Sequence, residues 1–102
     1  MSTKQLPRDT VRDLLGIARA LYVVRENQGA PQPELDRIRE ISAWLVDALE
    51  LTRTAPDTLK HRAAWTKAER ATSVLSELLL AHDESTKRLV GAQAERLRAR
   101  GR

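Results

Sequence analysis

The sequence predicts an all-α protein, a three-helix bundle made of a helical hairpin and one long C-terminal helix. Apolar residues recur at spacings of three and four along the chain, which is the period of an amphipathic helix. The 4 prolines all lie at or before Pro56, where they separate two shorter helical segments. From Asp57 onward no proline occurs, and only Gly91 interrupts a helix predicted over residues 57–99.

Length and composition favour one compact helical unit. With 102 residues, the chain is expected to form a single helical domain over residues 1–102, small enough that self-association would add to its stability. Hydrophobic residues make up 41% and charged residues 31%, which is typical of a folded protein. No apolar run approaches the ~20 residues of a membrane span, and the N-terminus lacks the apolar segment of a signal peptide. We therefore expect no membrane contact and a cytoplasmic location.

The first helix is predicted over residues 8–27. Gly29 suits the left-handed position that ends many helices, and Pro31 and Pro33 prevent the helix from continuing. A connection this short predicts that the next helix runs antiparallel to the first. The expected apolar stripe of the first helix consists of Val11, Leu14, Leu15, Ala18, Leu21 and Tyr22.

The second helix is predicted over residues 33–53, with Pro33 in its first turn, where a missing N–H costs nothing. The segment breaks before Pro56, because proline disfavours helical geometry in the residue that precedes it. The expected inner face consists of Leu35, Ile38, Ile41, Leu45, Ala48 and Thr52.

The third segment allows two geometries. We favour a continuous helix over residues 57–99, because no glycine or proline enforces a turn near residues 82–86. In that helix Leu75, Leu79, His82 and Leu89 fall on a degraded heptad seam, with polar positions that weaken it. The alternative is a break near residues 82–86, with Asp83 or Ser85 capping a fourth helix that folds back on the bundle.

Motifs for catalysis are missing from the sequence. The chain has no nucleotide-binding glycine loop, no zinc-protease motif and no serine-nucleophile elbow, and it has 0 cysteines. His61 and His82 would stand ~31 Å apart on one helix, too far to share a metal ion within a chain. The sequence therefore predicts a non-enzymatic protein with no cofactor and no metal.

The leading functional hypothesis is an interaction or scaffold subunit, which self-associates or binds a protein partner through its long C-terminal helix. That helix would span roughly 65 Å, about twice the length of either earlier helix, so half of it would lack a partner within the chain. The predicted partner or oligomer interface consists of Trp65, Leu75, Leu79, Leu80, His82, Leu89, Val90 and Leu97.

The alternative hypothesis is a small nucleic-acid-associated subunit. The net charge is +4, and the basic residues concentrate at the C-terminal end, where Glu95 is the one acidic residue after Lys87. A second basic patch lies in the first half of the third segment, around Trp65. The predicted phosphate contacts are Lys60, Arg62, Lys67 and Arg70 in that patch, and Arg96, Arg98, Arg100 and Arg102 in the basic end at residues 96–102.

Overall fold

The computed structural model describes residues 8–51 and 59–100. These residues form α1 (Arg8–Asn27), α2 (Gln32–Leu51), α3 (Leu59–Leu80) and α4 (Glu84–Arg100), with no strand among them. The all-α fold class is therefore confirmed for this part of the chain. The bounds of α1 match the prediction, and α2 begins one residue earlier than predicted. The predicted end of the second helix at residue 53 and the predicted start of the third at residue 57 lie outside the described residues.

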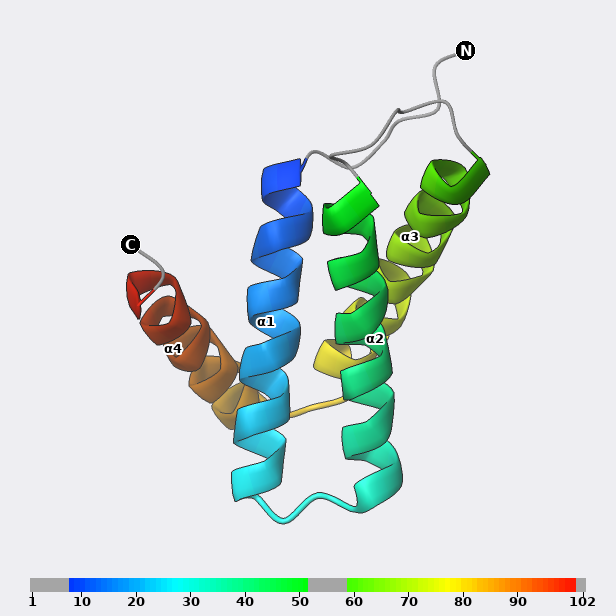
Figure 1. The fold of residues 1–102 in the computed structure, drawn as a ribbon. Coiled ribbons are helices and arrows are strands. Elements are labelled where there is room, and N and C mark those ends of the chain that lie inside the picture. The colour runs from blue at the N-terminus through cyan, green and yellow to red at the C-terminus, as the bar shows by residue number, and fades with distance from the viewer. Residues whose placement is uncertain (1–7, 52–58, 101–102) are drawn as a thin grey trace.

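The four helices are arranged around an antiparallel α1/α2 hairpin. The third helix packs on α2, and the fourth packs on α1, while contact between α1 and α3 is slight. Figure 1 shows α3 and α4 on opposite flanks of the hairpin, diverging from the short connection that joins them. The four helices therefore do not close into a ring, because α3 and α4 make little contact with each other.

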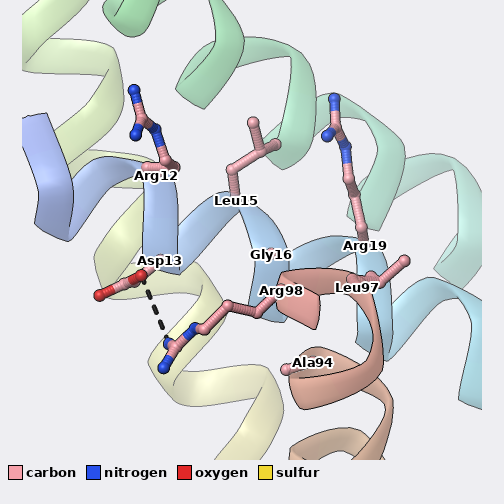
Figure 2. A pocket seen from close by; sticks show the side chains of 8 residues that line it. All are labelled: Arg12, Asp13, Leu15, Gly16, Arg19, Ala94, Leu97 and Arg98. Carbon is pink, nitrogen blue, oxygen red and sulfur yellow. Dashed lines mark hydrogen bonds and ion pairs between the residues drawn. The ribbon is translucent and has the colours of Figure 1, made fainter. Parts of the chain in front are cut away.

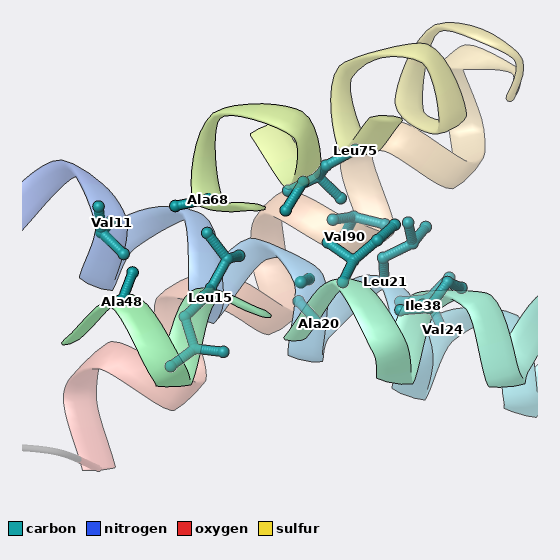
Figure 3. Packing of buried hydrophobic residues seen from close by; sticks show 14 of the residues in the cluster. Val11, Leu15, Ala20, Leu21, Val24, Ile38, Ala48, Ala68, Leu75 and Val90 are labelled. Carbon is teal, nitrogen blue, oxygen red and sulfur yellow. The ribbon is translucent and has the colours of Figure 1, made fainter. Parts of the chain in front are cut away.

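The core is built from the predicted apolar stripes. Every described residue of the predicted inner face of α2 is buried, and Thr52 lies outside the described residues. In α1, Val11, Ala18 and Leu21 are fully inaccessible, whereas Leu14 and Tyr22 are partly buried. Figure 3 shows Leu21 with Leu75 and Val90, which bring α3 and α4 into the same cluster. Small residues allow the helices to approach closely along their length. The fully buried alanines are Ala18, Ala20, Ala48, Ala68 and Ala71.

The turn between α1 and α2 follows the sequence prediction. Gly29 has a φ of 76°, in the left-handed region that glycine adopts without strain. Its N–H donates to the Glu26 carbonyl at 3.0 Å, and the Ala30 N–H donates to the Arg25 carbonyl, also at 3.0 Å. This pair of bonds is a Schellman motif, which satisfies carbonyls at the end of α1 and reverses the chain.

The prediction of a continuous C-terminal helix, and with it the three-helix bundle, is wrong. The chain turns at residues 81–83, and Asp83 caps α4 by accepting a hydrogen bond from the Thr86 backbone N–H at 2.8 Å. Two residues of α4 become buried, namely Thr86 and Val90. The turn is favoured because it places Val90 in the core against α1, a tertiary contribution that outweighs the cost of ending α3. The alternative of a fourth helix capped at Asp83 is confirmed.

None of the four described helices combines the length and the apolar character that a membrane span requires.

Candidate partner-binding surface between α1 and α4

The structure divides the predicted interface residues into two groups. Trp65, Leu75 and Val90 are at most 6% exposed and belong to the core of the chain itself, so in this fold they present no surface to a partner. The remaining predicted residues reach the surface to different degrees. Leu80 is 75% exposed and Leu89 49% exposed, while Leu79, His82 and Leu97 are partly buried.

His82 lies in a polar cluster at the corner where the two turns meet. Its Nε2 is 3.9 Å from Glu34 Oε1, and Glu34 Oε2 accepts a hydrogen bond from Arg25 Nε at 2.9 Å. Gln28 joins the same corner, because its amide nitrogen donates to the Thr86 hydroxyl at 3.2 Å. These bonds tie the start of α4 to the end of α1 and the start of α2.

The capping carboxylate of Asp83 is held in its charged form. The hydrogen bond from the Thr86 backbone N–H lowers the pKa of Asp83 below its ordinary value, and the Thr86 hydroxyl adds to this effect. Electrostatic interactions with His82 and Arg25 also lower the pKa of Asp83, to a smaller extent. The cap at the start of α4 therefore remains ionised across the neutral range.

We expect the start of α4 to loosen in acid. Because the folded-state pKa of Asp83 is lowered, the stabilisation is fully present above the unfolded pKa, about 3.9, and is lost as the pH falls through the lower folded value. The measurement is the amide chemical shift and exchange rate of Thr86 during an acid titration. Asp83→Asn keeps a capping oxygen that does not titrate, so its Thr86 amide should not follow this transition. The same titration in both proteins would contradict the assignment.

The predicted phosphate contacts do not form one surface. Arg62, Lys67 and Arg70 are exposed on α3, whereas Arg96, Arg98 and Arg100 are exposed on α4. These helices lie on opposite flanks of the hairpin (Figure 1). The side chains of Lys60 and Arg102 lie outside the described part of the chain. The structure thus separates two basic regions that the sequence hypothesis combined.

A groove between α1 and the C-terminal half of α4 is the best candidate for a binding site. It is open to solvent, has a volume of about 420 Å³, and combines an apolar floor with charged edges. Its lining residues, shown in Figure 2, are Arg12, Asp13, Leu15, Gly16, Arg19, Ala94, Leu97 and Arg98. We call this the α1/α4 groove.

Glycine helps to keep this groove open. A Cβ added at Gly16 would meet no atom within 4 Å, so the space beside the α1 backbone is empty. Arg12 and Arg19 extend from α1 to the same side, with Leu15 between them (Figure 2). Any side chain larger than glycine at position 16 would therefore reduce the space between the two helices.

Two of the three arginines that line the groove are uncompensated within the described part of the chain. Arg98 Nη2 lies 3.4 Å from Asp13 Oδ1, and Arg98 Nη1 lies 3.6 Å from Glu95 Oε1, so this guanidinium is paired at the surface. Neither Arg12 nor Arg19 has an acidic partner at ion-pair distance among the residues that the structure describes. Both arginines are exposed and can bind a negatively charged ligand.

A second, smaller groove lies along the other half of the same helix pair. Its volume is about 260 Å³, and its lining is more apolar than that of the α1/α4 groove. Leu89, which is half-exposed, lines this second groove. Together the two grooves are lined by α4 residues from Leu89 to Arg98. Its lining residues are Val23, Val24, Asn27, Gln28, Leu89, Ala92, Gln93 and Arg96.

Sequence reasoning missed the contribution of α1 to this surface. Arg12, Gly16 and Arg19 follow one another at spacings of four and three, so they share one face of the helix. Because this face is polar, the sequence predicts that it is exposed to solvent but does not predict a binding groove. It becomes one side of a groove because α4 packs beside it, which the prediction of a continuous helix did not allow.

Among residues 8–51 and 59–100, no three His, Cys, Asp or Glu side chains gather where they could share a metal ion. The chain matches no protein-family model, no curated protein and no solved structure. Its function is therefore inferred from the chemistry of its surface.

Proposed function

We propose that this chain is a non-enzymatic protein-interaction module, which binds an acidic, amphipathic helical segment of a partner protein in the α1/α4 groove. The observation that carries the proposal is the combination of an apolar floor with arginines along its edges. Helix-binding grooves use their floor to bury the apolar face of the ligand. The arginines would pair with carboxylates on the polar face of the same segment.

The residue types in the groove suit this ligand. Leu97 is partly buried and offers alkyl surface, Ala94 and Gly16 leave room for an incoming side chain, and Leu15 closes the groove from the core side. A guanidinium forms two parallel hydrogen bonds to a carboxylate, which fixes the orientation of the ligand as well as adding affinity. Arginine around an apolar centre is a common composition of protein interfaces.

A protein ligand fits this groove better than a nucleic acid. Nucleic-acid surfaces that bind single strands use aromatic side chains as stacking platforms, and the eight lining residues contain no aromatic ring. The arginines also surround alkyl groups. A phosphate backbone has no apolar face that could cover these groups, whereas an amphipathic helix has one. The basic side chains of α3, which would extend a phosphate-binding track, lie on the opposite flank.

This proposal retains the C-terminal helix as the partner-binding element and adds α1 to it. Ala94, Leu97 and Arg98 come from α4, whereas Arg12, Gly16 and Arg19 come from α1. Binding then requires α4 to be docked on α1, because neither helix forms the groove alone.

Charge reversal of the two unpaired arginines provides the first test. The probe is a fluorescent synthetic peptide in which leucine at spacings of three and four alternates with glutamate. We expect Arg12→Glu with Arg19→Glu to weaken its binding about 10- to 100-fold, because each lost charged contact costs roughly 1 kcal/mol or more. Fluorescence anisotropy measures the affinity. The matched control is Arg62→Glu with Lys67→Glu, which changes net charge equally on α3 and should leave binding within about threefold.

Gly16→Leu tests the groove without changing charge. The side chain would enter the open space and block it, so binding of the peptide should fall about tenfold or more, while the fold remains intact. Gly91→Leu is the control, because a Cβ at Gly91 also meets nothing within 4 Å, on a surface outside the groove. Equal losses in the α1 and α3 charge variants would contradict a specific site. An oligonucleotide that displaces the peptide from the wild type would favour the nucleic-acid hypothesis.

A further inference from the structure

We infer that this chain can exchange its fourth helix with a second copy, by straightening residues 81–83 so that α3 and α4 become one helix. The partner is a second copy of the chain, and the surface that receives the exchanged helix is the face of α1 that α4 already covers. The result is a symmetric dimer in which each α4 packs on the α1 of the other copy. This inference goes beyond the proposed function and does not depend on the identity of a ligand.

The contacts of α4 make such an exchange feasible. The fourth helix packs on α1, and its contacts with the other helices are slight. Its main attachments are Val90 in the core, Ala94 and Leu97 packed against that core, the Gln28–Thr86 hydrogen bond and the Arg98–Asp13 ion pair. Each of these contacts can form between two copies with the same geometry, so exchange requires no new docking surface.

The connection to α3 is unusually easy to convert into helix. It consists of Ala81, His82 and Asp83, with neither glycine nor proline, and alanine is the best helix former. The α3 hydrogen bonds already extend into it, since the Ala81 N–H donates to the Glu77 carbonyl at 3.1 Å and the His82 N–H to the Leu79 carbonyl at 3.2 Å. A straight helix would also pair N–H and carbonyl groups that the two helix ends now leave to water.

Helix length decides where α4 goes once the connection is straight. A single helix over residues 59–100 would be ~63 Å long. The longest dimension of the folded chain is 42 Å. The straightened α4 would therefore project beyond its own body and could not return to its own α1, which leaves that face open for the α4 of a second copy.

The degraded heptad seam predicted from the sequence would form a contact between the two copies in this dimer. Leu79, His82, Thr86 and Leu89 are spaced by three, four and three residues, so they share one face of a straight helix. In the monomer the turn divides this face between α3 and α4, and Leu89 remains 49% exposed. Where the two straightened helices cross, this face would bury Leu89 between the copies.

Three substitutions at the connection test this exchange, one that should favour the dimer and two that should oppose it. Asp83→Ala removes the cap that stabilises the closed form, which should shift each chain about fivefold toward the straight form. Because both chains of the dimer must straighten, the dimer association constant should rise about 25-fold. Glu84→Pro fits the first position of α4 but prevents residue 83 from being helical, and should abolish the dimer. Ala81→Gly is a milder second variant, which should lower the association constant about 25-fold. Light scattering after size-exclusion chromatography, across a wide concentration range, measures the dimer.

A cross-link distinguishes exchange from simple side-by-side dimerisation. The chain has 0 cysteines, so Asp13→Cys with Arg98→Cys introduces one unique thiol pair where the two side chains now approach. A short bis-maleimide applied to isolated dimer should join two chains on a denaturing gel, because the thiol at position 98 of one copy lies beside the thiol at position 13 of the other. Applied to monomer, it should join the two helices of one chain.

Any one of three results would overturn the inference. The first is a Glu84→Pro protein that dimerises like the wild type, and the second is an Asp83→Ala protein that remains monomeric. The third is a dimer in which the cross-link joins positions 13 and 98 of the same chain. Binding of the leucine–glutamate peptide separates this inference from the proposed function. Monomeric Glu84→Pro should still bind that peptide, because the α1/α4 groove is intact in the closed form.

Discussion

Replacing Leu75 by alanine is expected to destabilise the fold by about 2–5 kcal/mol, because it leaves a cavity that the surrounding helices fill only partly. Leu75 is 1% exposed and belongs to the cluster that joins α3 to Leu21 and Val90. For a chain of this size the loss should lower the melting temperature by about 10 °C or more. Urea denaturation followed by circular dichroism gives the free energy of unfolding.

Leu80→Ala is the matched control for this experiment. Both residues are leucines of α3 and both were predicted interface residues, but Leu80 is 75% exposed. Its truncation should change the free energy of unfolding by less than about 0.5 kcal/mol. The loss in Leu75→Ala should also be the same at all protein concentrations, because the side chain is buried within one chain. Equal destabilisation by the two variants would contradict the burial of Leu75 and the exposure of Leu80 on α3.

The hairpin could be predicted from the sequence because its determinants are local. The spacing of Leu35, Ile38 and Ile41 alone identifies the buried face of α2, since side chains three and four apart share one side of a helix. Gly29 likewise identifies the turn, because it adopts a backbone conformation that other residues avoid. In both cases the residue type carries the structural information directly.

The turn before α4 could not be predicted in the same way. Asp83 is acceptable both inside a helix and as a cap, and the two states differ by about 1 kcal/mol locally. The balance is decided by burying Val90 against α1, a contact between residues far apart in sequence. The α1/α4 groove depends on the same contact, so Arg12 and Arg19 appeared in sequence only as part of a solvated helix face.

Val90→Asp is expected to release α4 from α1. Val90 is 3% exposed and is one of the two buried residues of α4, and a buried carboxylate without a partner costs several kcal/mol. The fourth helix should therefore separate instead of burying the charge. Amide exchange measured by NMR should show lost protection in residues 86–97, while the amides of α1 and α2 exchange as in the wild type.

The neighbouring Leu89→Asp is the control, since it makes nearly the same chemical change at a site that is 49% exposed. It should retain protection of α4, and it should retain binding to the acidic peptide at the α1/α4 groove, which Leu89 does not line. Val90→Asp should lose both, because Ala94 and Leu97 leave the groove when α4 separates. Unchanged protection in Val90→Asp would contradict the docking of α4 through this residue. Retained peptide binding after α4 had separated would instead place the binding site on α1 alone.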